Sequence, residues 1–309
     1  MPRLWAGPYK EGERMEMDST RFLRDSTIAV IGLGVMGGSF AGRLRQIGAH
    51  RIIAYDVNEE TLAAALADKV IDAGYAKGNA ALAEAALLIF CLPLHDMIEF
   101  MKVNRSFFRP GQIATDIIGI KGGSAEEVEA VLPEYVDYVP GHPMAGREGC
   151  GYEMADAAVF EGANYIIVPS KRSGQESIRL IKSLAKALGC GHVSIVTAAE
   201  HDRRIAYTSC LPHVLATTLV NSASMNDEMK CFIAGSFRDG TRVADINAPL
   251  WTKLLLSDRK SLLTEIEHFR TALSEMENAL QNKDEARLYA FLSEAAKRRR
   301  RLIHADRNG

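Results

Sequence analysis

The stretch TIAVIGLGVMGGSF, from Thr27 to Phe40, decides the fold of this 309-residue chain. A short apolar run, typical of a buried strand, ends in three glycines with the spacing G-x-G-x-x-G, at Gly32, Gly34 and Gly37. A second apolar run, RIIAYD, ends at Asp56, 19 residues after the last of these glycines. A strand, a glycine turn, a helix and an acidic residue in this order indicate a dinucleotide-binding βαβ unit, which the glycine spacing alone would not establish.

Each glycine has a physical task in such a turn. Gly32 allows the tight turn, Gly34 lets the backbone approach the pyrophosphate, and Gly37 lets helix and strand pack closely. The N-terminus of the following helix presents free N–H groups and the positive end of its dipole to the phosphates. A carboxylate at Asp56 accepts hydrogen bonds from the ribose 2′-OH and repels a 2′-phosphate, so we expect NAD rather than NADP as the cofactor.

Further cofactor contacts are expected at the carboxyl edge of the sheet, where open α/β sheets bind their ligands. Two later apolar runs end there, in FCLPL and in ATDIIG, although ordinary strand-to-helix turns use the same residue types. The predicted cofactor-binding residues are Gly32, Leu33, Gly34, Val35, Met36, Gly37, Asp56, Leu92, Pro93 and Asp116.

Beyond the glycine turn, continuous apolar runs alternate with helical stretches as far as HVSIVT, which ends at Thr197. This order predicts an α/β fold of the Rossmann type, doubly wound with a mainly parallel sheet, followed by an all-α dimerisation domain. We divide the chain into a polar lead-in (1–26), the NAD-binding domain (27–197), a helical substrate and dimerisation domain (198–296) and a basic tail (297–309). The tail, KRRRRLIHADRNG, is interpreted as a solvated helix end.

The helical region contains two long helices by pattern. The first is interrupted at Pro212, and the second carries apolar residues at alternating gaps of four and three, which is coiled-coil spacing. An intramolecular bundle and a dimer interface both fit this seam, and we favour a homodimer. The seam consists of Leu262, Ile266, Phe269, Leu273, Met276 and Leu280.

Composition excludes several classes of function. The net charge of −2 gives no reason to expect nucleic acid or an anionic membrane as a partner. Five cysteines without a CxxC pair argue against a disulfide framework and a zinc site, so no metal is expected. The N-terminus lacks the apolar core of a signal peptide, and the longest apolar run, AALLIFCLPL, is too short to span a membrane. We therefore expect a cytoplasmic protein.

The segment DYVPGHPMAGREGCGYE presents one imidazole on unusually stiff backbone, because Pro140 and Pro143 flank His142. His142 follows an apolar run, so it is predicted at the carboxyl edge of the sheet beside the nicotinamide. Hydride transfer from an alcohol needs a base for the hydroxyl proton, and histidine can serve near neutral pH. His201 and Asp202, at the start of the helix interrupted by Pro212, are interpreted as a capping and charge arrangement.

Two arginines suggest anion binding, and a histidine is a further candidate site residue. Arg238 and Arg242 lie in SFRDGTRVADINAPLWTK with Trp251, framed by glycine and proline, which suits recognition of carboxylates as well as a solvated linker. His213 follows Pro212 directly, where the helix is expected to kink. The kink either aims the polar side chain of His213 into a cleft or has no role beyond the shape of the helix.

These motifs in this order resemble the prephenate and arogenate dehydrogenases of tyrosine biosynthesis. The resemblance covers Thr27 to about Leu280, and GHPMAGREGCG and FRDGTRVADINAPLW are its most specific elements. It implies an N-terminal NAD(P)-binding domain and a helical domain that forms the dimer. It also implies that the substrate is prephenate or arogenate.

Residue by residue, the resemblance implies that His142 is the catalytic histidine and that His213 binds substrate. Arg242 matches the arginine that binds a substrate carboxylate, and Arg238 stands where a basic residue is usual. Glu148 matches a glutamate that pairs with the arginine and gates access, and Trp251 an aromatic residue near the dimer contact.

One departure concerns Gly119 in DIIGIKG, where many relatives have serine, so a backbone N–H or a water must replace that hydroxyl beside His142. The expected reaction is the NAD-dependent oxidative decarboxylation of prephenate to 4-hydroxyphenylpyruvate, CO₂ and NADH. The alternatives are an arogenate dehydrogenase, a β-hydroxyacid dehydrogenase, which GLGVMG also resembles, and a non-catalytic NAD-sensing dimer.

Overall fold

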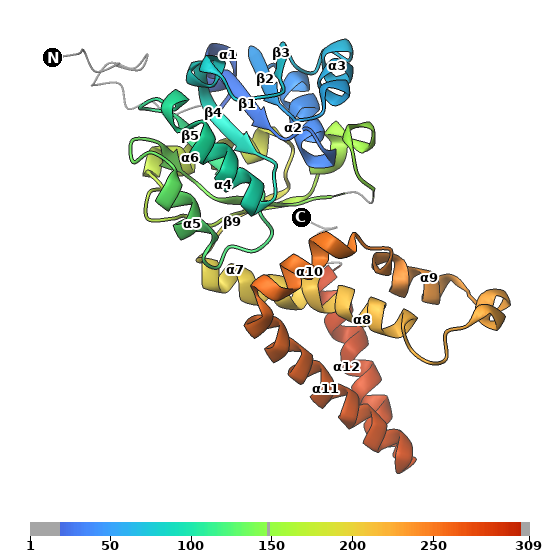
Figure 1. Cartoon of the computed structure of the whole chain (residues 1–309). Helices are drawn as coiled ribbons and strands as arrows, with labels where there is room; N and C mark the ends of the chain where they lie inside the picture. Colours follow the sequence, from blue (N-terminus) through green and yellow to red (C-terminus); the bar gives the residue numbers. More distant parts are fainter. Residues whose placement is uncertain (1–18, 147–148, 304–309) are drawn as a thin grey trace. The chain divides into compact units, whose positions relative to one another are not determined.

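The computed structural model describes residues 19–146 and 149–303. The chain forms two compact units that divide between Asp202 and Arg203, somewhat later than the 197/198 boundary expected from the sequence. The helix α7 (Ala198–Ile205) begins in the first unit and continues across the division (Figure 1). The dinucleotide fingerprint and His142 therefore belong to the first unit, together with the first half of α7.

The first unit is built on a six-stranded parallel sheet in the order β3-β2-β1-β4-β5-β6. This is the strand order of a dinucleotide-binding fold, and it reverses direction between β1 and β4. The strands are β1 (Thr27–Ile31), β2 (Arg51–Tyr55), β3 (Ala73–Tyr75), β4 (Ala85–Phe90), β5 (Ile113–Asp116) and β6 (Asp137–Tyr138).

A second, three-stranded sheet in the order β7-β8-β9 holds the rest of the strands of this unit. The strands β7 (Gly141–Met144) and β8 (Asn164–Ile167) are antiparallel, whereas β8 and β9 (His192–Ile195) are parallel. The apolar runs that form β8 and β9 were expected in the large, mainly parallel sheet, and they lie in this separate sheet instead. The chain leaves the large sheet after the two residues of β6, at Pro140, which cannot donate to a strand ladder.

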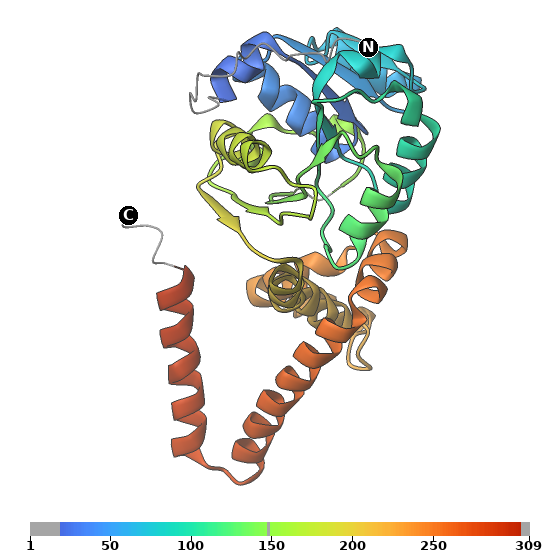
Figure 2. The same ribbon diagram turned by 90° about the vertical axis from the view of Figure 1, so that its left-hand side faces the viewer.

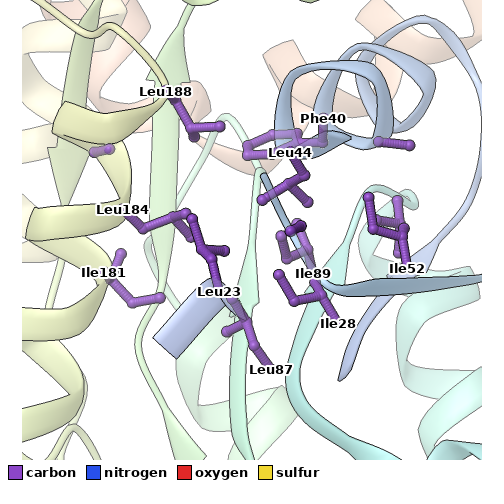
Figure 3. Close-up of a cluster of buried hydrophobic side chains, with 14 of the residues drawn as sticks. Leu23, Ile28, Phe40, Leu44, Ile52, Leu87, Ile89, Ile181, Leu184 and Leu188 are labelled. Carbon is purple, nitrogen blue, oxygen red and sulfur yellow. The ribbon is translucent and has the colours of Figure 1, made fainter. Parts of the chain in front are cut away.

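Helices cover both faces of the large sheet, and each face has its own apolar cluster. Phe40 and Leu44 of α2 and Leu184 of α6 belong to one of these clusters (Figure 3). These helices are α2 (Val35–Gln46), α3 (Glu59–Ala67), α4 (Leu94–Val103), α5 (Ser124–Val131) and α6 (Gln175–Ala187). Short 3₁₀ turns lie at Ala80–Glu84, Arg105–Phe107, Tyr152–Met154 and Ala157–Phe160 (η1 to η4).

The expected polar lead-in is partly structured. Residues Ser19–Asp25 form the helix α1, whose Phe22 and Leu23 are buried in the same cluster as Phe40. Residues 1–18 lie outside the described part of the chain. So short a helix carries no periodic signal in the sequence, because two apolar residues in one turn do not establish a repeat.

Every element described in residues 203–303 is helical, as expected. The interruption predicted at Pro212 is a π-helical turn, Ala206–Cys210 (η5), between α7 and α8 (Leu211–Val220). The wider turn accommodates a ring that has no N–H and clashes with the carbonyl four residues before it. The remaining elements are η6 (Asp227–Cys231), α9 (Gly235–Thr241), η7 (Arg242–Ala244), α10 (Ala248–Ser257), α11 (Arg259–Gln281) and α12 (Glu285–Ile303).

The two longest helices, α11 and α12, run in opposite directions and are joined by a short turn (Figure 2). The basic segment predicted as a tail from residue 297 is helical as far as Ile303, and residues 304–309 lie outside the described part. None of the helices in the described residues has the length and apolar character needed to cross a membrane.

Candidate active site

The glycine turn separates β1 from α2, and its three glycines are constrained differently. Gly32 has a φ of +91°, a left-handed conformation that side chains rarely adopt. A Cβ on Gly37 would lie 1.8 Å from the carbonyl oxygen of Gly32, so no side chain fits there. A Cβ on Gly34 would meet no atom within 4 Å. The fold therefore requires glycine at two of these positions, whereas at Gly34 the open space fits a ligand that approaches the backbone.

Gly34 is also the N-cap of α2, and it gives the helix no side-chain cap. The N–H groups of the first helical turn are available to an anion at this end of the helix. Leu92 packs against the turn, since its Cδ2 lies 2.7 Å from the position of a Cβ on Gly32. Pro93, which follows, is the N-cap of α4. The turn after β1 and the turn after β4 thus lie together at the carboxyl edge of the sheet, as predicted.

Asp56 follows β2 and is held over the glycine turn by backbone. Its Oδ2 accepts a hydrogen bond from the N–H of Leu33 at 2.7 Å, and its Oδ1 accepts one from Asn58 at 2.9 Å. The side chain of Leu33 is fully buried, so only its backbone could contact a cofactor. Val35 and Met36, at the start of α2, are half-buried. These contacts fit a dinucleotide on the turn, with the carboxylate on the same edge.

The carboxylate of Asp116 is completely buried, so only the backbone of this predicted cofactor-binding residue could contact a cofactor. Its Oδ1 accepts from Nζ of Lys121 at 2.5 Å, and its Oδ2 accepts from the hydroxyl of Tyr138 at 2.6 Å. The same Lys121 ammonium donates to the carbonyl oxygen of Gly141 at 2.7 Å. Asp116 thus anchors a buried lysine, and that lysine holds the backbone immediately before His142.

Burial dominates the electrostatics of this cluster. It lowers the pKa of Lys121, although the neighbouring Asp116 carboxylate acts in the opposite direction. Burial also raises the pKa of Tyr138, and the same carboxylate adds to that shift. Neither residue was predicted as part of the site. A lysine and a tyrosine among apolar neighbours carry no sign of a common partner until the strands β5 and β6 bring them together.

His142 lies within β7, paired with Ile166 of β8, and its ring is half-buried. Its Nδ1 is 2.9 Å from Nε2 of His201, on α7. Burial, followed by Lys121 and His201, lowers the pKa of His142 from 6.5 to about 3. The ring is therefore neutral at physiological pH and can accept a proton.

His201 is itself buried and continues the chain of contacts. Its Nδ1 is 2.7 Å from Oδ1 of Asp202. The Asp202 carboxylate accepts two backbone hydrogen bonds as well, from Lys121 at 2.8 Å and from Gly122 at 2.5 Å. The capping role expected for these two residues is wrong, because their side chains link α7 to the loop after β5 and to His142. The side chain that accepts an N–H at this end of the helix is that of Thr197, from Glu200.

Gly119 lies beside the other edge of the imidazole, as its place in the sequence suggested. A Cβ there would be 3.8 Å from Nε2 and from Cε1 of His142, an ordinary contact distance. Within the described part of the chain, Nε2 has no hydrogen-bond partner. The position is thus close enough for a side chain to touch the ring, and glycine leaves that edge of the ring uncovered.

The second unit holds the other group of predicted site residues. His213 stacks on Trp251 with ring centroids 3.7 Å apart and an interplanar angle of 26°. Its Nδ1 donates to the carbonyl oxygen of Ser209 at 2.8 Å, which leaves Nε2 as an acceptor. Ser209 belongs to the π-helical turn before Pro212. The kink therefore has a second effect, because it supplies the carbonyl that fixes the orientation of His213.

The two arginines lie on elements next to α8. Arg242 begins η7 and Arg238 lies in α9, both side chains are exposed, and α8 packs against both elements. Glu148 falls outside the described residues. The structure thus brings His213 and Trp251 into contact and places Arg242 on an element adjacent to them.

Two family models match the chain in succession. Residues 40–194 match the nucleotide-binding domain of prephenate dehydrogenase, and residues 197–294 match its dimerization domain. Together these matches cover most of the chain.

Individual proteins agree with this. The prephenate dehydrogenase of Lactococcus lactis is 31% identical over 285 residues, which are 90% of this chain and 78% of that protein. The cyclohexadienyl dehydrogenase of Zymomonas mobilis is 29% identical over 282 residues, 88% of this chain and 94% of that protein. A crystal structure of the prephenate dehydrogenase of A. aeolicus, in complex with hydroxyphenyl propionate and NAD⁺, superimposes with a TM-score of 0.80 and 27% identity. That alignment covers 90% of this chain and 98% of the other.

Proposed function

Since this chain belongs to the prephenate/arogenate dehydrogenase family, we propose that it catalyses the NAD-dependent oxidative decarboxylation of prephenate. The observation that carries the proposal is the neutral, half-buried imidazole of His142, in the same unit as the dinucleotide turn. The products would be 4-hydroxyphenylpyruvate, CO₂ and NADH.

His142 is the proton acceptor of the reaction in this proposal. Its Nε2 takes the proton of the ring hydroxyl as the carbinol carbon loses a hydride, so the C–O bond becomes a carbonyl. NAD⁺, when bound, supplies the acceptor for that hydride. The carbonyl is conjugated through the ring to the carbon that bears the carboxylate. Breakage of the bond to CO₂ delivers its electron pair into this system and yields a phenolate, which regains the proton from Nε2 of His142 and becomes the phenol. A separate base for decarboxylation is therefore unnecessary.

NAD is proposed over NADP because of Asp56. Its carboxylate is fixed by two backbone N–H groups at the edge of the glycine turn, where a negative charge favours a ribose diol and repels a 2′-phosphate. The pyrophosphate would lie against Gly34 and the first turn of α2, where a Cβ would fill otherwise open space. The nicotinamide dinucleotide of the A. aeolicus protein supports the same class of cofactor.

Substrate binding is proposed for the residues around α8. Arg242 and Arg238 would bind the carboxylates of prephenate, with Glu148 as a partner of the arginine. His213 has its Nδ1 committed to Ser209, so its Nε2 can accept a hydrogen bond from substrate. Trp251 holds the ring of His213 by stacking and so limits its rotation.

A homodimer formed through the helical unit completes the proposal. The predicted seam on α11 is partly uncovered in the single chain, where Phe269, Leu273 and Leu280 are exposed and Leu262 is buried. An apolar hollow also opens on this unit, lined by Leu219, Met225, Met229, Phe232, Ile233 and Phe237. A second copy would bury these surfaces, which agrees with the match to a dimerization domain.

The test is a steady-state comparison of prephenate and arogenate, each with NAD⁺ and NADP⁺. The proposal expects the highest kcat/KM for prephenate with NAD⁺. Higher kcat/KM for arogenate would replace prephenate by the second candidate, which the similarity to a cyclohexadienyl dehydrogenase favours, since both substrates are cyclohexadienyl compounds. If the dinucleotide binds but neither substrate is turned over, the chain is the non-catalytic dimer considered above.

A further inference from the structure

We propose that Asp202 and His201 are positioning residues that act on the base through a relay, Asp202–His201–His142. They hold His142 in the tautomer with a free Nε2 lone pair, and they accept the positive charge that the abstracted proton brings. The proposal rests on the assignment of His142 as the base. It gives a function to two buried polar residues of α7 that the mechanism above does not use.

The tautomer follows from the donors around Asp202. Backbone N–H groups can only donate, and both Asp202 oxygens accept from them, which favours the ionised carboxylate. An ionised carboxylate can only accept, so the proton between it and His201 resides on Nδ1 of His201. The Nε2 of the neutral His201 ring is then an acceptor. The proton shared with His142 consequently resides on Nδ1 of His142, and its Nε2 carries the lone pair.

The relay also provides a place for the positive charge. When Nε2 of His142 gains the substrate proton, the ring becomes an imidazolium next to the Lys121 ammonium. Transfer of the Nδ1 proton to Nε2 of His201 returns His142 to a neutral ring and creates a His201 imidazolium. That cation lies 2.7 Å from the Asp202 carboxylate, so the charge moves from a cationic neighbour to an anionic one. The low pKa of His142 agrees with this direction, because the ring holds a proton poorly by itself.

The loop after β5 is shaped to receive this carboxylate. A Cβ on Gly122 would lie 2.8 Å from Oδ2 of Asp202, so a side chain at this position would displace the carboxylate. Gly119, on the same loop, offers the imidazole no hydroxyl. Nε2 is the ring nitrogen near Gly119, whereas Nδ1 is the one next to His201. The orientation of the His142 ring therefore depends on His201 of α7 and not on a side chain at Gly119.

Two substitutions of His201 separate the two parts of the relay. In His201→Gln the side-chain oxygen can take the place of Nε2 and accept from His142, but it cannot take up a proton. In His201→Asn the shorter amide can reach only towards Asp202, so His142 loses its partner. We expect kcat to fall about 10-fold in His201→Gln and by about 10²-fold or more in His201→Asn, with the dissociation constant for NAD⁺ within about twofold of wild type.

Asp202→Asn tests the end of the relay, because a neutral amide cannot balance the positive charge of a His201 imidazolium. We expect kcat to fall at least as far as in His201→Gln. The matched control is Asp72→Asn. Asp72 also accepts a backbone N–H, from Ile52 at 2.7 Å, but it precedes β3, at the opposite edge of the sheet from β6. We expect this control to lower the melting temperature without a change in kcat. A drop in kcat equal to that of Asp202→Asn would mean that lost stability explains both.

Nitrogen-15 NMR of the histidine rings tests the tautomer directly and does not depend on turnover. The signal of His142 is assigned by its loss in His142→Gln. We expect a protonated Nδ1 and an unprotonated Nε2 in the wild type, a pattern that persists in His201→Gln and is lost in His201→Asn. A wild-type ring protonated at Nε2, or unchanged kcat in both His201 variants, would overturn the relay. Absence of turnover in the wild type, with the expected tautomer present, would instead count against the proposed reaction.

Discussion

The two units of this chain differ in how many of their large apolar side chains are buried. The first unit buries its large apolar side chains on both faces of a sheet, in clusters that include Phe40 and Phe90. The second unit contains about a third of the chain, yet 13 of the 19 large apolar side chains found exposed among the described residues belong to it. The first unit is thus built to fold around its own core, whereas the second is built to be completed by another surface.

The same contrast applies to the two histidines of the predicted site. His142 is held through buried charged and polar groups that come from distant parts of the first unit. His213 is held by the carbonyl four residues before it and by one stacked ring. A chemical role suits the first arrangement, because it controls a proton. A binding role suits the arrangement around His213, because its contacts fix only the orientation of the ring.

The largest expected effect is on the chemical step. His142→Asn should lower kcat by about 10³-fold or more, because it removes the proton acceptor, while the dissociation constant for NAD⁺ stays within about twofold. His213→Asn should act mainly on KM. Steady-state kinetics and NAD⁺ titration measure both, with the exposed His192→Asn as control. Equal losses of kcat in the two site variants would abolish the distinction between chemical and binding histidines.

A charge on the exposed seam should break the second unit's expected interface. Leu273→Asp should raise the dimer dissociation constant by about 10²-fold or more, because each protomer would then place a carboxylate in an apolar interface. Analytical ultracentrifugation measures this constant. The control is Val103→Asp, on a residue of the first unit that is 77% exposed. If both variants behave as wild type, the seam on α11 is not the interface.

Removal of Arg242, the proposed carboxylate-binding residue of the second unit, should change the KM for prephenate. Arg242→Ala should raise the KM for prephenate about 10- to 100-fold with kcat little changed, because the carboxylate it binds keeps its charge throughout the reaction. Arg238→Ala serves as the comparison on the adjacent helix α9 and should have a smaller effect. An unchanged KM in Arg242→Ala would remove it from the substrate site.

Within the first unit, two glycines of one motif should behave differently. Gly34→Ala should fold normally but weaken NAD⁺ binding about 10-fold, since its Cβ meets no protein atom and occupies the space proposed for the pyrophosphate. Gly37→Ala should lower the melting temperature strongly, because its Cβ would collide with the carbonyl of Gly32. Thermal melts and NAD⁺ titrations separate the two. A destabilised Gly34→Ala variant would show that the fold, and not the ligand, requires that glycine.

The last expected effect concerns stability and not activity, and it is a pH dependence of the free energy of unfolding. The unfolded chain protonates residue 142 near pH 6.5, whereas the folded chain does so only near pH 3. The unfolded state thus binds more protons in this range, and the free energy of unfolding falls as the pH is lowered, by at most about 1.4 kcal/mol per pH unit from this group. Urea denaturation of the wild type and of His142→Gln, between pH 6.5 and 4, measures the difference. A slope that is the same in both would contradict the buried neutral state.

Much of the architecture could be predicted from local patterns. The strand, glycine turn and helix around Gly34 and the apolar run before Asp56 are contiguous in sequence, and so are the long helices of the second unit. Such elements follow from hydrophobic periodicity and turn chemistry, which act over a few residues. The helix α1 and the departure of β7 from the large sheet could not be predicted in this way.

The amino-acid sequence by itself determined that a dinucleotide turn is followed by a histidine on stiff backbone and then by helices with an apolar seam. The groups that surround that histidine follow from the folded arrangement of the chain. His142 pairs with His201, 59 residues later in the chain, and Asp202 receives the N–H of a lysine 81 residues before it. Hydrogen bonds between groups so far apart in the chain are not marked by any repeating pattern in the sequence. They exist because a buried donor or acceptor must find a partner, and the packing of strands and helices determines which partners are within reach.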